Sequence, residues 1–424
     1  PYSFLSSHAP RSDTHACLAS AKKPRDRGSQ PQIGVSLADE IDSRLPRFHF
    51  QVKGHPLEKE INEAENIEFQ TLWNEEVWSG PVKLPHDVKP IDLLFVYKAK
   101  GDKEGLFTKL KARLALRGDQ ERHEVWWGDS YSPVMSLATF KILLAMHAID
   151  LTVHYHHGDI TAAFVSAKMK RDVYTRLPSH LCDPDHVGLF FKLERALYGG
   201  VDAGRCFYDD WVKFHITLGF QTIHHDKCFL FKTSKDGRHF IKMVFHVDDT
   251  CYAQRGDRMW KRYLRRLEHR FKYKMEPLTH FLGMSIVRNP ETGAFTLGLR
   301  AQVEKMLRVF HMDKCNPSKH PVGSRVPTKA DVPTTPEGIN DAKNIPQRQA
   351  VGHLNYLQNM LFPELSYPVR VASRFNSSPC KAVWDWIKEI FSWLAGGNWT
   401  PYVIRGGPWE TMQIRAWSDS NHAK

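Results

Sequence analysis

The stretch that decides the fold is Phe240-Ile-Lys-Met-Val-Phe-His-Val-Asp-Asp-Thr-Cys-Tyr-Ala253, in which two short apolar runs flank one acidic pair. Residues 241–247 have the β-branched and aromatic content of a buried strand, and residues 250–253 can return beside it as a hairpin. The carboxylates of Asp248 and Asp249 then lie at the tip. Two like charges about 4 Å apart repel by roughly 4 kcal/mol at an effective dielectric near 20, and a bound cation relieves this cost.

A second strand-like stretch, residues 151–160, also ends at an acidic residue. It leads to Asp159 and then into Thr161-Ala-Ala-Phe164. Three carboxylates at strand ends, from two segments far apart in the sequence, predict a site for divalent metal. The alternative interpretation is structural: an acidic pair is common in polar turns, and Asp159 could begin a helix as its N-cap.

Three histidines precede Asp159 and resemble a metal-binding tract. On a strand, however, His154 and His156 point to the face opposite that of His157 and Asp159. Because side chains on opposite faces do not converge on one ion, a histidine-bound metal is not expected here.

The composition favours a polyanionic partner. The 424 residues are 42% hydrophobic and 25% charged, which is typical of a globular protein with two or three domains. Lys and Arg number 59 against 47 Asp and Glu, for a formal net charge of +12. Nucleic acid is therefore a better candidate partner than an acidic small molecule.

The cysteines and the hydropathy exclude several classes of protein. The 7 Cys are widely spaced, odd in number and form no Cys-x-x-Cys motif, so we expect reduced intracellular thiols and neither a zinc ribbon nor a disulfide framework. No apolar run approaches the roughly 18 residues of a membrane span, and no signal peptide is recognisable. The start at Pro1 and the end at Lys424 lead us to expect a piece of a longer protein.

A cationic strand is predicted near the start of the folded part. Residues 92–98 and 108–116 have the pattern of two hairpin strands, and in the second Lys109, Lys111 and Arg113 alternate with apolar residues. Their period of two places all three cations on one face. Such a face can hold a triphosphate or a nucleic-acid backbone, although a merely solvated strand has the same pattern.

The remaining pattern predicts a mixture of helices and strands. Residues 1–50 have the composition of a disordered tether, and residues 314–346 that of a proline-rich extended linker. Helical spacing predicts helices at 57–73, 139–148, 202–219, 258–271, 301–310, 349–361, 367–375 and 382–394. Further strands are expected at 187–197, 228–233, 281–287 and 412–416.

Five motifs occur in a consistent order. They are Lys111-Ala-Arg-Leu-Ala-Leu-Arg-Gly118, Tyr131-Ser-Pro-Val-Met-Ser136, Asp159-Ile-Thr-Ala-Ala-Phe164, Leu197-Tyr-Gly-Gly-Val-Asp-Ala-Gly-Arg205 and His246-Val-Asp-Asp249. In sequence and spacing they resemble the reverse transcriptase of copia-type LTR retrotransposons, from about residue 57 to residue 424. Trp417-Ser-Asp419 is similar to the opening of the ribonuclease H domain of that family.

The resemblance implies an α+β fold of the right-hand polymerase type, with fingers, an antiparallel palm sheet and a helical thumb, followed by the start of a ribonuclease H-like domain. The implied division is residues 1–50 tether, 51–300 fingers and palm, 301–400 thumb and connection helices, and 401–424 ribonuclease H start, with Asp419 as its carboxylate.

The resemblance also implies the site residues. Asp159, Asp248 and Asp249 would be the catalytic ligands of two Mg²⁺ ions, for which Mn²⁺ could substitute. The implied nucleotide-binding residues are Lys111, Arg113, Phe164 and Asp202, and those that contact the template or primer are Arg205 and His246. The basic helices after residue 255 would follow the duplex backbone and bind it independently of sequence.

Several positions depart from the family pattern. Asp202, Val201 and Gly204 stand where the family has Gln, Lys and Pro, and His246 replaces a Tyr. An acidic Asp202 would repel a triphosphate. The resemblance thus supports two hypotheses, an active RNA-directed DNA polymerase and a decayed relic that only binds nucleic acid. A Mg²⁺-dependent phosphohydrolase would explain the carboxylates but not the motif order.

The implied partners are an RNA template, a DNA primer, deoxynucleoside triphosphates and other Gag and Pol segments, with no membrane. The implied location is a cytoplasmic virus-like particle, with a nuclear phase.

Overall fold

The central feature of the computed structural model is an antiparallel sheet of six strands in the order β11-β4-β10-β9-β8-β7. The strands are β4 (His154–Ile160), β7 (Gln221–Thr222), β8 (Phe229–Thr233), β9 (Phe240–His246), β10 (Asp249–Arg255) and β11 (Tyr273–Pro277).

Residues 41–42, 44–101, 106–121, 130–323, 325–397 and 399–407 are described, all within the compact unit Val35–Lys424. Most of the expected tether, the strand expected at 412–416 and Asp419 lie outside them.

The acidic hairpin has the predicted form. β9 and β10 pair with His246 opposite Asp249, and the two-residue turn Val247-Asp248 joins them. β4 then pairs with the free side of β10, although its residues lie far away in the sequence. Both strands of the hairpin are mostly buried, which explains their nearly continuous apolar runs.

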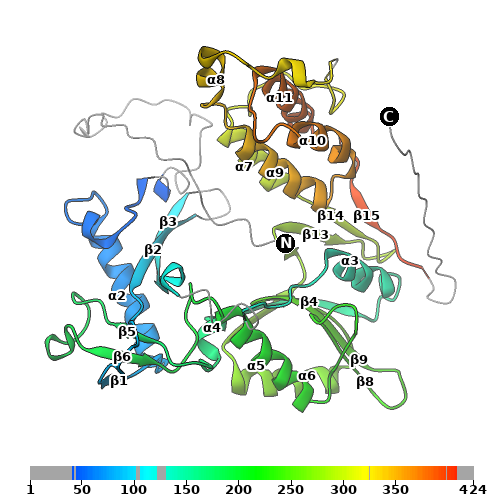
Figure 1. Ribbon diagram of the computed structural model, residues 1–424. Coiled ribbons are helices and arrows are strands. Elements are labelled where there is room, and N and C mark those ends of the chain that lie inside the picture. Colours follow the sequence, from blue (N-terminus) through cyan, green and yellow to red (C-terminus); the bar gives the residue numbers. More distant parts are fainter. Residues whose placement is uncertain are drawn as a thin grey trace, which may run out of the picture. The chain divides into compact units, whose positions relative to one another are not determined.

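Helices cover both faces of this sheet (Figure 1). On one face α5 (Ala203–Thr217) and α6 (Asp257–Arg270) pack through aromatic contacts, such as that between Trp260 and His156. On the other face lies α3 (Leu137–Met146), where the carbonyl of Leu144 accepts a hydrogen bond of 3.3 Å from the Tyr155 hydroxyl. The alternation of side chains along β4 thus sends neighbouring residues to different helices.

A four-stranded antiparallel sheet and a group of helices follow in the chain. The sheet has the order β12-β13-β14-β15, and its strands are β12 (His280–Phe281), β13 (Met284–Arg288), β14 (Phe295–Gly298) and β15 (Tyr402–Ile404). The helices are α7 (Arg300–Val309), α8 (Pro336–Ala342), α9 (Gln347–Met360), α10 (Ser366–Ser373) and α11 (Lys381–Ala395). Both groups contribute to the hydrophobic core of the six-stranded sheet.

The prediction of an entirely extended linker at 314–346 was wrong, because α8 lies within it. Thr335 caps this helix by accepting a hydrogen bond from the Gly338 amide at 3.2 Å, and Pro336 occupies the first turn. A capping Thr followed by Pro is a helix-start signal that the high proline content obscured.

The N-terminal part of the described chain forms a second hydrophobic core. It contains α2 (Glu58–Asn74), the hairpin of β2 (Leu93–Gly101) with β3 (Phe107–Leu116), and a three-stranded sheet in the order β1-β6-β5. The strands of that sheet are β1 (Trp78–Val82), β5 (Tyr174–Arg176) and β6 (Phe190–Leu193). The helix at 57–73 and the hairpin of 92–98 with 108–116 are therefore confirmed.

Gly199 allows the end of β3 to pack closely against the turn that precedes α5. The Leu116 amide donates to the Tyr198 carbonyl at 2.7 Å, and Gly199 follows with φ +81°. A Cβ on Gly199 would lie 2.2 Å from the Leu116 carbonyl oxygen. Only glycine permits both this backbone conformation and this approach.

The turn of the acidic hairpin is strained at Val247, whose φ is 60°. A β-branched residue is rarely found there, and the conformation costs on the order of 1–3 kcal/mol. We therefore predict that Val247→Gly raises the free energy of unfolding by about 1 kcal/mol, because relief of strain exceeds the added entropy of the unfolded chain. Urea unfolding followed by fluorescence would measure this change.

The matched control is Val287→Gly. Val287 is 65% exposed within β13 and has no left-handed backbone, so the same change should lower stability there. Equal destabilisation by the two substitutions would contradict strain at Val247.

Candidate active site

The predicted carboxylates come together at one end of the six-stranded sheet. In the pairing of β10 with β4, Asp249 lies directly opposite Asp159. Asp248 occupies the turn, and its carbonyl accepts a hydrogen bond from the Ile160 amide at 3.1 Å. Two segments distant in sequence thus present three acidic residues at adjacent positions.

The charges of these residues act on one another. Burial raises the pKa of Asp248, and the negative charges of Asp159 and Asp249 raise it further, while the Arg113 guanidinium opposes them. A carboxylate with a raised pKa is one whose ionised form is poorly compensated. Since all three side chains offer only oxygen, the donor set fits a hard cation such as Mg²⁺.

Asp249 accepts hydrogen bonds from two other residues at its carboxylate. His157 Nε2 hydrogen-bonds to its Oδ1, and the Leu282 amide donates to its Oδ2 at 3.3 Å. The bond to Asp249 raises the pKa of His157. His157 was not selected from the sequence, although its position two residues before Asp159 places it on the same face of β4.

The cationic face predicted on β3 is present. Lys109, Lys111 and Arg113 are exposed, and the residues between them are buried. Across the hairpin, Lys98 pairs with Lys111 and Lys100 with Lys109. Burial and the charges of neighbouring cations lower the pKa of Lys100. Like charges directly opposite one another destabilise a hairpin, so this face is suited to an anionic ligand.

Arg113 connects the cationic face to the carboxylates. Its guanidinium carbon lies 5.2 Å from the centroid of the Tyr198 ring, and that ring meets Phe164 edge-on at 5.3 Å. Arg113 also acts electrostatically on Asp248. Tyr198 was not selected from the sequence as a site residue, although it belongs to one of the five motifs.

Asp202 lies in a buried ion-pair network at the start of α5. It is 8% exposed, and Arg171 donates to its two oxygens from Nε at 2.9 Å and from Nη2 at 3.1 Å. The Arg171 Nη2 also contacts Glu121. The negative charge of Asp202 is therefore offset within the protein, and its contact with a nucleotide stays a prediction.

Arg205 on α5 and His246 on β9 are the predicted contacts of nucleic acid. Arg205 donates to Asp209 at 2.9 Å and to the Tyr131 carbonyl at 3.2 Å. His246 is half-buried at the end of β9, opposite Asp249. Asp419 lies outside the described residues. The nucleic-acid contacts of Arg205 and His246 likewise stay predictions.

Comparison with known proteins identifies the family. Residues 75–324 match the family model described as reverse transcriptase (RNA-dependent DNA polymerase).

The chain belongs to the reverse transcriptase family.

Its relatives are retrotransposon polyproteins, as the motifs indicated. The chain is 26% identical over 385 residues to the retrovirus-related Pol polyprotein from transposon TNT 1-94 of Nicotiana tabacum, covering 90% of this chain and 29% of that protein. It is 27% identical over 422 residues to the Pol polyprotein from transposon RE1 of Arabidopsis thaliana, covering 97% of this chain and 27% of that protein. The chain thus spans less than a third of these relatives. The copia-type resemblance is confirmed.

A solved structure of a foamy viral protease-reverse transcriptase in complex with double-stranded DNA is also similar. The match covers 78% of this chain and 48% of that chain, at 13% identity and a TM-score of 0.40. The mixed helical and antiparallel architecture agrees with the α+β class expected for a reverse transcriptase. Within the described part of this reverse transcriptase, no helix is long and apolar enough to cross a membrane.

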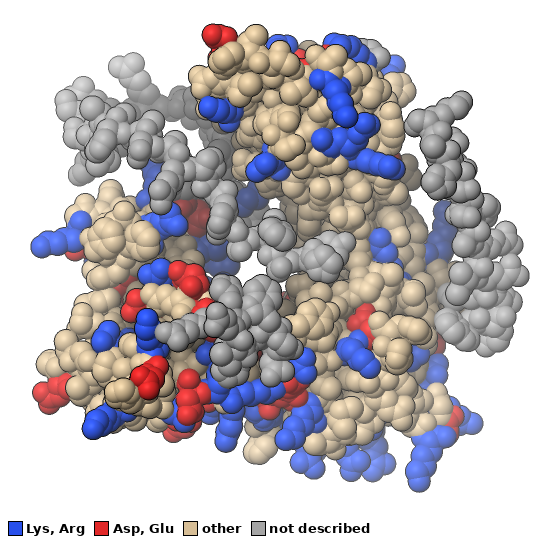
Figure 2. Space-filling model, viewed as in Figure 1, with Lys and Arg blue, Asp and Glu red and all other residues tan. Residues whose placement is uncertain are grey.

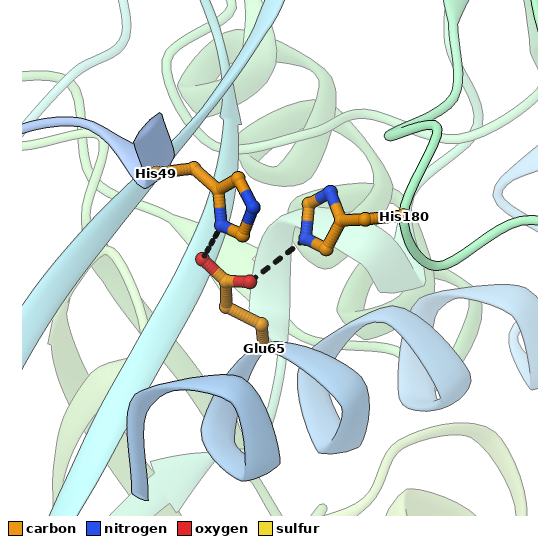
Figure 3. A group of neighbouring side chains, drawn as sticks. All are labelled: His49, Glu65 and His180. Atoms are coloured by element: carbon orange, nitrogen blue, oxygen red, sulfur yellow. Dashed lines mark hydrogen bonds and ion pairs between the residues drawn. The ribbon is translucent and has the colours of Figure 1, made fainter. Parts of the chain in front are cut away.

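A separate group of possible metal ligands lies in the N-terminal core. The two oxygens of the buried Glu65 accept hydrogen bonds from His49 Nδ1 at 2.9 Å and His180 Nε2 at 2.8 Å (Figure 3). The two rings are nearly parallel, at 12°, with centroids 3.6 Å apart. The ligand atoms of the three side chains lie within 4.8 Å of one another, but each of the two histidine nitrogens is already bonded to a Glu65 oxygen. The group is better described as a hydrogen-bonded clamp that joins three segments of the reverse transcriptase.

The first prediction from this site concerns Asp248. Its raised pKa means that ionisation costs stability at neutral pH, so Asp248→Asn should raise the melting temperature by a few degrees without metal. Mg²⁺ should stabilise the unaltered protein and have much less effect on the variant. Thermal unfolding at pH 7 with and without Mg²⁺ measures both effects. Asp313→Asn, at an exposed position, is the control, and an undiminished Mg²⁺ response in Asp248→Asn would contradict metal binding here.

The second prediction concerns Glu65. Its hydrogen bonds to His180, Tyr97 and His49 hold its pKa below the ordinary value despite burial. A carboxyl group with a lowered pKa in the folded state contributes stability above about pH 4.5, which is lost as the pH falls through the folded-state pKa. Glu65→Gln should therefore cost about 2 kcal/mol at pH 7 and progressively less below pH 4.5.

Urea unfolding across this pH range compares Glu65→Gln with Glu63→Gln, an exposed position on the same helix. If Glu65→Gln lowered stability equally at every pH, the negative charge of Glu65 would not contribute to the stability of the clamp.

Proposed function

We propose that this chain is the RNA-directed DNA polymerase of a retrotransposon Pol polyprotein, transferring a nucleotidyl group from a deoxynucleoside triphosphate to a primer 3′ hydroxyl. The observation that carries the proposal is the pairing of Asp159 with Asp249 beside the turn that holds Asp248. Family membership supports it. The substrates are an RNA template, a DNA primer and deoxynucleoside triphosphates.

The metal sites follow from the donor set. Asp159 and Asp248 would hold two Mg²⁺ ions, and Asp249 would be a weaker ligand because His157 and Leu282 already occupy its oxygens. Bound Mg²⁺ supplies Lewis acidity, which lowers the pKa of the primer hydroxyl and neutralises the leaving pyrophosphate. The raised pKa of Asp248 agrees with a site that requires a cation.

The other residues bind and orient the substrates. Lys111 and Arg113 bind the triphosphate, and Tyr198 holds the Arg113 guanidinium in place by a cation–π contact at 5.2 Å. Phe164, packed edge-on against Tyr198, lies beside the sugar and excludes a 2′ hydroxyl. Arg205 contacts the template and His246 the primer end. Asp202 borders the nucleotide pocket with its charge offset by Arg171.

The division of the chain belongs to the same proposal. Residues 51–300 form the fingers and palm, with the six-stranded sheet as the palm, and residues 301–400 form the thumb and connection helices. Residues 401–424 begin the ribonuclease H-like domain, although 402–404 also pair with β14. The other Gag and Pol segments are partners in a cytoplasmic virus-like particle with a nuclear phase.

The second candidate is a relic that binds nucleic acid without catalysis. Its basis is the departure of Asp202, Val201 and His246 from the family pattern. The bidentate ion pair with Arg171 weakens this case, because it offsets part of the negative charge of Asp202, the rest of the Arg171 charge being shared with Glu121. The activity test below separates the two candidates.

We predict that the full chain extends a DNA primer on an RNA template with Mg²⁺ and that Asp159→Asn reduces extension at least about 100-fold, because metal-assisted charge stabilisation provides several kcal/mol. Binding of the primed template should persist. Gel-based primer extension and fluorescence anisotropy measure the two properties, with Asp313→Asn as the matched control. Extension retained by Asp159→Asn would refute the assignment, and binding without extension in the unaltered chain would favour the relic.

A further inference from the structure

The helix α6 carries a continuous basic stripe. Its exposed cations are Arg258, Lys261, Arg262, Arg265, Arg266 and Arg270. Their spacing of three and four residues places them on one side of the helix, while the buried Trp260, Tyr263 and Leu267 form the other side. Arg258 and Arg270 are separated by roughly 18 Å at the rise of an α-helix.

The stripe lies on the side of the six-stranded sheet opposite the catalytic carboxylates. On one face of the sheet, the ring of His156 stacks on Trp260 of α6, and the ring of Tyr252 meets Trp260 edge-on. His157, the next residue of β4, points to the other face and contacts Asp249. The sheet therefore separates the stripe from the carboxylates, and the contact of α6 with the duplex backbone stays a prediction. Figure 2 shows Lys and Arg gathered along the lower edge of the molecule, where Figure 1 places α5 and α6.

Repulsion between the cations of the stripe destabilises α6 in the free protein. Like charges four residues apart, such as Arg258 with Arg262, Lys261 with Arg265 and Arg262 with Arg266, destabilise a helix by about 0.2–0.5 kcal/mol per pair. Among the described residues the stripe makes one ion pair, between Arg270 and Asp210 at 2.6 Å. An anionic ligand would remove this repulsion.

The chemistry of the stripe favours a phosphate backbone. Five of the six cations are arginines, whose planar guanidinium groups bind phosphate oxygens in pairs. No large apolar side chain of α6, all of whose residues are described, is strongly exposed, so the helix lacks the apolar contact that a membrane surface requires. The length of the stripe accommodates several phosphates of one strand.

We propose that the basic stripe of α6 is a second nucleic-acid site, which holds single-stranded RNA on the back of the sheet while a primed duplex occupies the catalytic side. This inference rests on the proposed polymerase function. The strand held there would be a part of the template that is not being copied, so the site would keep a long RNA attached to the enzyme when the duplex dissociates.

The test measures RNA binding to an enzyme whose catalytic side is already occupied. The full chain is saturated with a primed template that has a chain-terminated primer, and a labelled single-stranded RNA is then titrated at several salt concentrations. The complex should bind the RNA. The variant Arg262→Gln, Arg265→Gln, Arg266→Gln should bind it at least about 10-fold more weakly, and the slope of log K against log salt should decrease by about 2, since each phosphate contact contributes roughly 0.7.

A charge-matched control removes three exposed lysines elsewhere, through Lys59→Gln, Lys83→Gln and Lys89→Gln, and should bind RNA like the unaltered chain. Circular dichroism should show that the stripe variant keeps the helical content of the unaltered chain, because the substitutions relieve repulsion between cations on α6. If the stripe variant and the lysine control lost RNA binding to the same extent, the loss would reflect net charge alone, and the proposal would be overturned.

Three further outcomes would overturn it: no RNA binding to the occupied enzyme, unchanged binding by the stripe variant, or stripe-dependent binding of phosphatidylserine vesicles or polyglutamate in place of RNA. Extension of a short primed template, measured on the same proteins, tests the proposed function separately. If extension fails but the free chain binds RNA through the stripe, the polymerase assignment falls and the stripe site stands.

Discussion

The antiparallel pairing of β4 with β10 is the constraint on which the rest of the structure depends. It sets Asp159 opposite Asp249 and fastens the turn through the bond from Ile160 to Asp248. Like charges would otherwise separate, so the hydrogen bonds of the ladder and the buried faces of both strands must hold them together. The helices α5 and α6 on one face of the sheet, and α3 with the four-stranded sheet on the other, bury these strands, while the strained Val247 in the turn destabilises the arrangement.

A second constraint links the cationic hairpin to these carboxylates. The approach of Gly199 to Leu116 fixes the end of β3, and from there Arg113 reaches the ring of Tyr198 and the field of Asp248. Tyr198 packs on the N-terminal core and meets Phe164, which packs on the core of the six-stranded sheet. The position of the β3 cations relative to the carboxylates is therefore fixed by backbone packing as well as by charge.

Much of this was predictable from local patterns, and the misses have physical causes. The hairpin at Asp248, the alternation on β3 and the main helices follow from residue periodicity. β11 was missed because its alternation of Tyr273 and Met275 with Lys274 and Glu276 is too short to stand out at the edge of the sheet. The partnership of Asp202 with Arg171 and that of His157 with Asp249 join distant segments, which no local pattern reveals. The sequence predicted the basic stripe of α6 but not the face of the sheet on which α6 packs, because that face is set by tertiary contacts such as Trp260 with His156.

The short strand β15 has a consequence for how the domain can be divided. Its residues pair with β14, and Ile404 enters the same core as β4 and β10. Yet β15 lies well beyond residue 324, where the family match ends. A protein trimmed to that match would lose α2, the helices α8 to α11 and β15, and would leave β14 as an open edge that invites pairing between molecules. The part of the chain that completes this fold is therefore longer than the part that the family model matches.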